Sequence, residues 1–385
     1  MTDVTPARQA MYAQIVSQPA LLREVFELAE ERVYRVLADF EAQRWQAIYT
    51  AGCGDSFYAG LACEMAFARF CRLPVKALPA MSFSRYEVDN LAEHAVVFGI
   101  SNSGAVSRSL EAVALARAAG ADTIAITGHD GSAIVREAAA AIALPIAPMG
   151  RSPGIRSYTV QLLTLLLCAL CLGERRQTLS TAEAATWRQR LRDVAVCMEA
   201  TIQANDTLTR QIAEHLQDTE EWLFVGAGPS YATALFCAAK MVESCGANAW
   251  AQELEEWGHI QFFNRQERLP TCLLVPPGRS VDRALELLPY IKGIGRYTLL
   301  VADPGLPLHP AQIDTLLPLP QSVPEVFSPL VTCLPGELLA YYLAEVKGTQ
   351  FFTAPLRGVS NPGDRLRNSR ILPSLEGLAD PAVPS

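Results

Sequence analysis

The sequence predicts an α/β protein built from two tandem domains, each a central, mostly parallel sheet between two layers of helices. Short apolar, strand-like segments alternate with helical ones, which is typical of parallel sheets covered on both faces. A glycine turn also occurs twice. Residues 52–57 (Gly-Cys-Gly-Asp-Ser-Phe) align without a gap on residues 226–231 (Gly-Ala-Gly-Pro-Ser-Tyr), 174 positions later. Both turns follow a strand-like segment and precede a helical one, so the chain is expected to contain the same unit twice.

The first half supplies the clearest alternation of elements. Residues 7–45 repeat their apolar positions at helical spacing and contain no interior glycine. The expected elements that follow are a strand at 45–52, a helix ending near Phe70, a strand at 95–101, a helix at about 107–119 and a strand at 123–127.

A long helical stretch at 152–217 separates this alternation from a second one. There the expected elements are a strand at 222–226, a helix at 230–245, and strands at 271–275 and 298–302. The expected organisation is an N-terminal helical segment (1–45), a first domain (46–175), a helical connector (176–217), a second domain (218–350) and a C-terminal tail (351–385) rich in Pro, Gly and Ser.

Composition narrows the functional classes. The 385 residues are 50% hydrophobic and carry a net charge of −8. An acidic chain disfavours nucleic acid as a partner, because protein surfaces that bind the negatively charged nucleic-acid backbone are basic. We expect no membrane segment, because the longest apolar run, 162–172, is shorter than the roughly 20 residues that a span needs. The first residues show neither a charged nor an apolar leader region, so no signal peptide is expected.

The ten cysteines are expected to be reduced and structural, which fits a cytoplasmic protein. Most lie within apolar runs, where a free cysteine behaves as a small hydrophobic residue. Cys168 and Cys171 have the spacing of a redox or zinc pair, but no partner pair accompanies them. No cluster of His, Cys and carboxylates has metal-ligand spacing, so no metal is expected.

The glycine turns have the form of an anion site. A strand, a Gly-x-Gly turn and a helix start place backbone N–H groups around a concave site that suits a phosphate. The third glycine of a dinucleotide fingerprint is absent, since Phe57 and Tyr231 occupy its positions, and no Gly-Lys-Ser/Thr follows. We therefore expect no nucleotide or other cofactor. The simplest alternative is a tight turn that binds nothing.

A second turn strengthens the phosphate interpretation. Residues 100–104 (Ile-Ser-Asn-Ser-Gly) place Ser101, Asn102 and Ser103 at the end of a strand, where open α/β sheets bind ligands. Ser56 lies in the turn that follows the neighbouring strand. Serine hydroxyls from two such turns can hold a phosphate without a lysine. Arg156, at the start of the long apolar helix, could add a positive charge.

A charged pair occurs in only one of the two halves. Lys240 and Glu243 lie three residues apart on the helix after the second glycine turn, so they share a helix face. The corresponding residues of the first half are Ala66 and Arg69. This asymmetry favours a division in which one half binds phosphate and the other carries out chemistry. The alternative is an ordinary ion pair on a helix surface.

These motifs resemble the sugar isomerase (SIS) family. The resemblance rests on residues 52–60, on residues 100–104, on the doubled architecture and on the lead-in at 11–19, and it covers about residues 11–350. Within the family, the chain is similar to the isomerase half of glutamine–fructose-6-phosphate aminotransferase, to fructosamine-6-phosphate deglycases and to glucosamine-6-phosphate deaminases. The implied fold is two SIS-type domains.

The resemblance implies a role for each candidate residue. Ser56, Ser101, Asn102 and Ser103 would bind the phosphate of the sugar. Many relatives have Glu-Thr after the serine turn, where this chain has Ala-Val at 105–106, so Ser107 would have to replace the missing hydroxyl.

The same resemblance implies a catalytic set of Glu243, His259 and Lys240. Glu243 would move a proton between the sugar carbons C1 and C2, because a carboxylate is a suitable base for that step. His259 would open the sugar ring, a task that suits a group titrating near neutral pH. Lys240 would support Glu243. Glu256 is a rival base, although an acidic run such as 253–256 is usually a solvated face.

The sequence also departs from the aminotransferases. Thr2 follows Met1 where a glutaminase needs a nucleophilic cysteine, and no lysine follows Lys347 although the aminotransferase tail carries one. We therefore expect deglycation or deamination of a phosphorylated amino-sugar compound. The alternatives are a glucosamine-6-phosphate synthase without the glutaminase domain and a non-catalytic sugar-phosphate sensor. The resemblance further implies a homodimer in which each active site takes its histidine from the neighbouring subunit.

Overall fold

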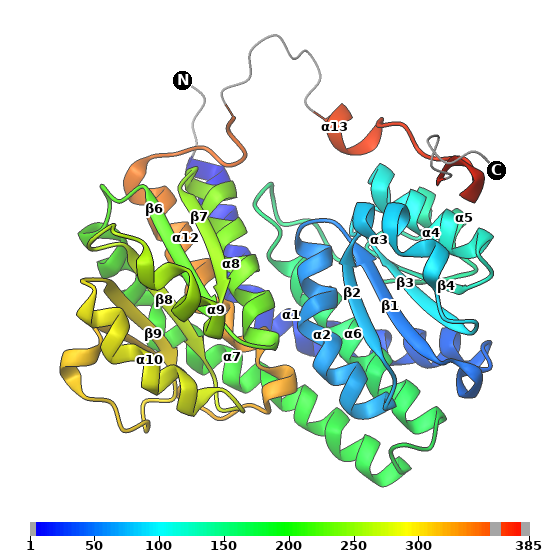
Figure 1. Ribbon diagram of the computed structural model, residues 1–385, viewed down its shortest axis with the longest axis horizontal. Helices are drawn as coiled ribbons and strands as arrows, with labels where there is room; N and C mark the ends of the chain where they lie inside the picture. The colour runs from blue at the N-terminus through cyan, green and yellow to red at the C-terminus, as the bar shows by residue number, and fades with distance from the viewer. Residues whose placement is uncertain (1–4, 355–362, 379–385) are drawn as a thin grey trace. The chain divides into compact units, whose positions relative to one another are not determined.

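Two five-stranded sheets form the framework of the computed structural model, which describes residues 5–354 and 363–378 (Figure 1). The first sheet contains β1 (Ala47–Gly52), β2 (Val75–Pro79), β3 (Ala95–Ile100), β4 (Asp122–Thr127) and β5 (Ala140–Ala143). The second contains β6 (Glu221–Gly226), β7 (Asn248–Glu253), β8 (Pro270–Val275), β9 (Tyr297–Ala302) and β10 (Thr315–Pro318). Every strand pairing described is parallel, which confirms the predicted α/β class.

Both sheets have the same strand order when the strands are counted from each glycine turn. The first runs β2-β1-β3-β4-β5, and the second, read from its other edge, runs β7-β6-β8-β9-β10. The strand before each glycine turn, β1 or β6, therefore lies second from an edge. The strands β1 and β3 are buried along their whole length, as expected for parallel strands covered on both faces.

The helices connect and cover the strands. They are α1 (Thr5–Ala38), α2 (Asp55–Cys71), α3 (Ala80–Tyr86), α4 (Ser107–Ala118), α5 (Ala133–Glu137), α6 (Arg156–Arg175), α7 (Thr181–His215), α8 (Pro229–Cys245), α9 (Leu254–His259), α10 (Val281–Gly293), α11 (Pro329–Thr332), α12 (Leu334–Lys347) and α13 (Asp364–Arg367). Short 3₁₀ turns occur at Ala42–Arg44, Val88–Asn90, Gln261–Phe263, Pro310–Gln312, Glu325–Phe327 and Leu375–Leu378.

The chain divides into two compact units, each discontinuous in sequence. The first-sheet unit comprises Val25–Ala147, Val160–Arg188 and the described part of the tail, 363–378. The second-sheet unit comprises residues 5–24, Pro148–Thr159 and residues 189–354. The helices α1, α6 and α7 each contribute residues to both units. The predicted N-terminal segment and tail also include residues 1–4, 355–362 and 379–385, which lie outside the described residues.

The predicted helical stretch at 152–217 is two helices, α6 and α7, separated at residues 176–180. Within the described residues, α6 is the one helix that could cross a membrane by length and composition alone. Its most apolar 18-residue window is 89% buried in the structure. Core helices of folded proteins meet the same criterion, so the finding is weak evidence for a span.

All ten cysteines are free thiols, and all except Cys53 are buried. Cys168 and Cys171 lie inside the buried part of α6. Burial raises the pKa of the Cys171 thiol to about 12, which keeps it protonated and unreactive near neutral pH. The structure therefore favours packing over redox chemistry for this pair.

Candidate active site

The strands β1, β3 and β4 of the first sheet end side by side, at the carboxyl ends of the strands. Gly52, the last residue of β1, pairs with Ile100 at the end of β3, which pairs with Ile126 near the end of β4. The turns after β1, β3 and β4 therefore leave the sheet at the same level, with neighbouring strands only about 4.8 Å apart. Ser56 and the serine turn both follow strands that end here.

The first turn places Ser56 at the start of α2. Gly54 adopts φ 55° and ψ −127°, and its counterpart Gly228 adopts φ 52° and ψ −127°, a conformation open mainly to glycine. Ser56 is buried and accepts a hydrogen bond from Nε2 of Gln161 at 3.2 Å. Gln161 was not among the predicted site residues. Its polar amide within the otherwise apolar sequence of α6 is the signal that could have indicated it.

Two buried serine hydroxyls, one in the serine turn and one at the start of α4, have no hydrogen-bond partner among the described residues. The Oγ atoms of Ser101 and Ser107 are inaccessible to solvent and make no hydrogen bond within the described residues. A buried polar group without a partner costs about 1–3 kcal/mol, and folded proteins seldom retain one without a reason. The side-chain oxygen of Gln161, Oε1, likewise has no hydrogen-bond partner among the described residues. The two hydroxyls could donate to oxygen atoms of a ligand, and Oε1 of Gln161 could accept from a ligand hydroxyl.

Asn102 and Ser103 lie against the loop that follows β4. Asn102 is exposed. Its Oδ1 lies beside Gly128, and a Cβ atom added to Gly128 would be only 2.6 Å from that oxygen. Ser103 is half-buried and lines a pocket of about 590 Å³ with residues 128–132 of the loop after β4. Ala105, Pro145 and Arg367 complete the lining. Of the predicted phosphate-binding residues, only Ser103 lines this pocket.

Gly104 gives a test of the turn. Its φ is 59°, and a Cβ there would lie 2.1 Å from Oγ of Ser132. We expect Gly104→Ala to lose about 1–2 kcal/mol from backbone strain alone and more from the clash, as measured by urea denaturation. Gly120→Ala is the matched control, because Gly120 also has a positive φ, 84°, but open space around it. Equal losses in the two variants would contradict the proposed crowding at the serine turn.

The charged pair combines a buried lysine with a partly exposed glutamate, unlike an ordinary pair on a helix surface. Lys240 on α8 is fully buried, and its Nζ donates to Oε2 of Glu243 at 2.5 Å. It also lies 4.9 Å from the ring centroid of Phe236, which stacks on Tyr158. The Glu243 side chain remains 33% exposed. The helix therefore holds an accessible carboxylate in place with a buried ammonium group.

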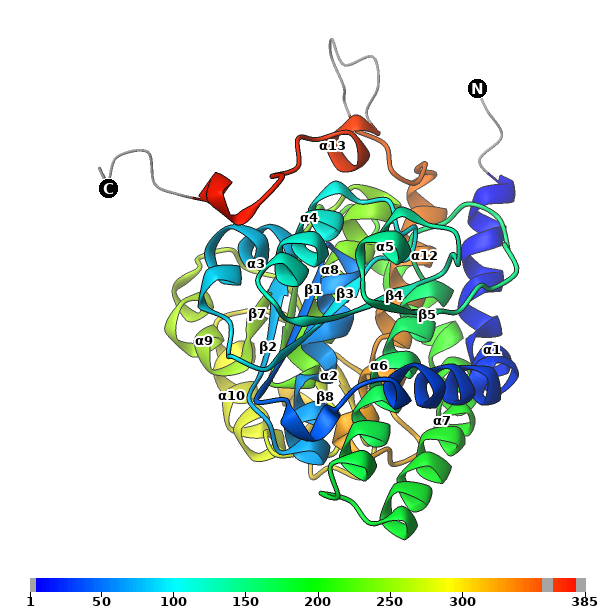
Figure 2. The ribbon, with the colours of Figure 1, turned by 90° about the vertical axis from the view of Figure 1, so that its right-hand side faces the viewer.

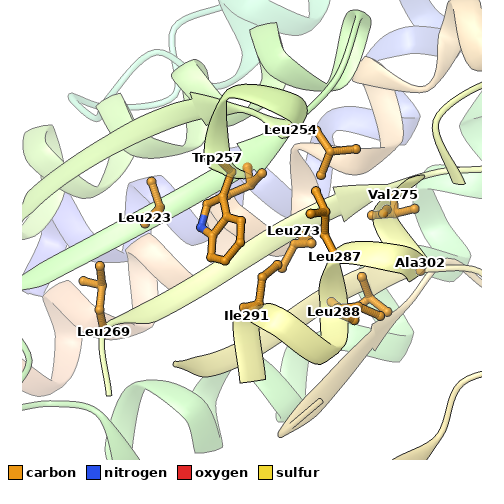
Figure 3. Packing of buried hydrophobic residues seen from close by; sticks show 13 residues of the cluster. Leu223, Leu254, Trp257, Leu269, Leu273, Val275, Leu287, Leu288, Ile291 and Ala302 are labelled. Carbon is orange, nitrogen blue, oxygen red and sulfur yellow. The ribbon is translucent and has the colours of Figure 1, made fainter. Parts of the chain in front are cut away.

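His259 lies at the end of α9, and its side chain is 68% exposed. Trp257 and Leu254, on the same helix, pack into the core of the second-sheet unit and fix the helix (Figure 3). The His259 ring contacts Glu255 at 3.6 Å. Within the described part of the chain, no hydrogen bond or ion pair joins it to Glu243.

The acidic run beside His259 is largely structural. Glu253 caps α9, because its carboxylate accepts the N–H groups of Glu255 and Glu256. Glu255 pairs with Arg283 at 2.6 Å. Glu256 is exposed.

The candidate residues are divided between the two units. Ser56, the serine turn and Ser107 belong to the first-sheet unit. The second-sheet unit carries Lys240, Glu243, Glu256, His259 and Arg156. Arg156 is buried in the first turn of α6. In residues 5–354 and 363–378, no group of three or more His, Cys, Asp or Glu side chains could hold a metal ion.

Known proteins with similar sequences cover nearly the whole chain. The chain is 26% identical over 355 residues to glutamine–fructose-6-phosphate aminotransferase (isomerizing) of Bradyrhizobium diazoefficiens, covering 91% of this chain and 58% of that protein. It is 29% identical over 307 residues to the enzyme of the same name from Streptomyces coelicolor, and the match covers 79% of this chain and 49% of that protein. The chain thus spans about half the length of the curated relatives it matches.

Solved structures show the same fold. The C-terminal domain of glucosamine-fructose-6-phosphate aminotransferase from Francisella tularensis superposes with a TM-score of 0.78 at 23% identity, over 89% of this chain and 97% of that one. Glucosamine-6-phosphate deaminase from Thermotoga maritima gives 0.70 at 18% identity, over 89% and 96%. Residues 43–171, which contain β1 to β5 and both serine-bearing turns, match the family model of the SIS domain. This part of the chain is therefore identified as a SIS domain.

Proposed function

We propose that this protein is a phosphosugar enzyme that removes the amine from a fructosamine 6-phosphate or an amino-sugar phosphate. The observation that carries the proposal is the pair formed by buried Lys240 and partly exposed Glu243. A sensor that only binds sugar phosphate needs no carboxylate held beside a buried ammonium group. The names of the related proteins, which act on hexose and glucosamine phosphates, support the substrate class.

Glu243 is the proposed proton-transfer base. In a fructosamine 6-phosphate, the carboxylate would take a proton from C1 and return it to C2. The product is an imine, which water splits into an aldose phosphate and an amine. In a glucosamine phosphate, the proton would move from C2 to C1. One well-placed carboxylate can serve both directions, and Lys240 would hold it ionised and oriented.

The ring-opening role is proposed for His259 of a neighbouring subunit. An exposed histidine at the end of an anchored helix is available to a second copy of the chain. This arrangement makes the enzyme a homodimer with shared active sites.

The proposed phosphate site consists of Ser56, Ser101 and Ser107 with Gln161. We expect Ser101→Ala and Ser107→Ala to leave the free energy of unfolding unchanged or slightly higher, because each removes an unsatisfied buried hydroxyl. The same variants should bind glucose 6-phosphate about tenfold more weakly, since a hydrogen bond to a charged group contributes about 1.5–3 kcal/mol. Calorimetric titration and urea denaturation measure the two effects. A purely structural role would give the opposite pattern, with lower stability and unchanged affinity.

Incubation with a panel of phosphorylated fructosamines and amino sugars tests the reaction itself. Release of a hexose phosphate and an amine without added glutamine or ammonia supports deglycation or deamination. Turnover that requires fructose 6-phosphate and ammonia would instead support a synthase. Binding of hexose phosphates with no turnover in any assay would support a sensor.

A further inference from the structure

The described part of the C-terminal tail is docked on the first-sheet unit. Figure 2 shows this segment passing beside α3 and α4. Leu372 is buried in a hydrophobic cluster that includes Tyr49, Phe83 and Leu115, and Leu375 packs against the same cluster. The tail thus covers apolar surface between α3, α4 and the sheet.

A buried carboxylate fixes the tail in position. Glu111 on α4 is fully buried, and its Oε2 accepts the N–H of Leu372 at 2.7 Å. The neighbouring Arg108 bonds to Glu111 at 2.8 Å, to Oγ of Ser369 at 3.4 Å and to the carbonyl of Arg370. Backbone and side-chain contacts therefore set the path of residues 369–372.

This anchoring places Arg367 at the pocket that Ser103 lines. Arg367 ends α13, five residues before Leu372, and α13 packs against α4. Its exposed guanidinium forms no hydrogen bond or ion pair with any described residue, although it lines the pocket. The pocket also contains Asp130, whose carboxylate lies 3.4 Å from Arg32, so that acid already has a cation partner. Arg367 is left as a positive charge beside serine hydroxyls.

We propose that the docked tail supplies Arg367 as an anion-binding residue of the Ser103 pocket. This inference rests on the proposed function, because it assigns the positive charge to an acidic group of the sugar substrate. Arginine suits the role, since its planar donors match the oxygens of a phosphate or a carboxylate. The serine turn itself offers only neutral donors. The anion is either the sugar phosphate or a carboxylate on the group attached to the sugar nitrogen.

Titration calorimetry with Arg367→Ala tests the assignment, with Arg370→Ala as the matched control. Arg370 lies in the same tail and carries the same charge, but it does not line the pocket. We expect Arg367→Ala to weaken binding about five- to tenfold at low salt, and less at 1 M salt because of screening. Arg370→Ala should bind like the parent protein.

Two probes distinguish the source of the anion. Glucose 6-phosphate carries only the phosphate, and an unphosphorylated fructosyl amino acid carries only the carboxylate. A loss confined to one probe identifies the group that Arg367 binds. Leu372→Asp, which should undock the tail, is expected to reproduce the Arg367→Ala loss although Arg367 is still present. Equal affinities of Arg367→Ala and Arg370→Ala for both probes would overturn the proposal, even if the enzyme turned over a substrate normally. If no substrate is turned over but Arg367→Ala still binds a probe more weakly than Arg370→Ala, the result would count against the proposed reaction alone.

Discussion

Replacing Glu243 by Gln should lower the turnover of a verified substrate by about 10²- to 10⁴-fold, the usual effect of removing a general base. The amide keeps the shape of the side chain and loses the ability to accept a proton. Affinity for glucose 6-phosphate should stay within a factor of two or so, because the phosphate is assigned to Ser56, Ser101 and Ser107. Steady-state kinetics and calorimetry measure the two quantities.

The same variant should be less stable, so the assay needs a temperature well below its unfolding transition. Lys240 would keep its charge in a buried site beside a neutral amide. Breaking a fully buried ion pair costs about 3–5 kcal/mol, and the cost here should be smaller because the Glu243 side chain is 33% exposed. Glu256→Gln is the control, as an exposed carboxylate of the rival assignment. Full activity in Glu243→Gln with loss in Glu256→Gln would transfer the role of base to Glu256.

Mixing inactive variants tests whether His259 acts across a subunit interface. If each active site combines Glu243 of one chain with His259 of another, refolding a mixture of Glu243→Gln and His259→Ala should restore activity that neither variant has alone. A hybrid dimer would contain one site with both residues intact. A mixture that forms hybrid dimers but remains inactive would place both residues of a site in the same chain.

Glu111→Gln should be among the most destabilising conservative substitutions in the first-sheet unit. The Glu111 carboxylate is fully buried and accepts hydrogen bonds from the Leu372 amide, Ser84, Arg85 and Arg108. An amide group presents N–H donors where five donor atoms from four residues already converge. It also removes the negative charge that pairs with the guanidinium groups of Arg85 and Arg108. We expect a loss of about 3–5 kcal/mol in the free energy of unfolding. Glu41→Gln, in an exposed pair with Arg44, should change stability by less than about 1 kcal/mol.

The Glu111 effect should depend on pH in one direction. Burial favours a raised pKa, but the hydrogen bonds from the Leu372 amide, Arg85 and Ser84, with the charge of Arg108, outweigh it and lower the pKa of Glu111 below 4.5. A carboxyl group with a lowered folded-state pKa stabilises fully above its unfolded-state pKa and loses that contribution as pH falls through the folded value. The stability difference between parent and variant should therefore be constant from pH 6 to 8 and shrink below about pH 4.5. A difference that grows in acid would contradict the assignment.

The serine turn and the charged pair could be located from sequence because each depends on local geometry. A strand followed by a polar turn and a helix places Ser101–Ser103 at the carboxyl end of a parallel strand wherever the strand lies in the sheet. The i, i+3 spacing likewise places Lys240 and Glu243 on one helix face. The short edge strands β2, β5, β7 and β10 were not predicted. They are only partly buried, so they lack the continuous apolar runs that marked the central strands.

The sequence by itself determined the α/β class, the parallel strands around both glycine turns and the residue types at the serine turn. These follow from the alternation of apolar and polar residues and from backbone conformations that only certain residues adopt. Tertiary structure alone decided that Lys240 is buried, that Gln161 bonds to Ser56 and that the tail brings Arg367 to the pocket of Ser103. It also decided that the hydroxyls of Ser101 and Ser107 have no hydrogen-bond partner among the described residues. Burial and hydrogen bonding depend on residues that are far away in the sequence. The backbone N–H of Leu372, for example, donates to the carboxylate of Glu111. Local sequence patterns carry no record of those neighbours.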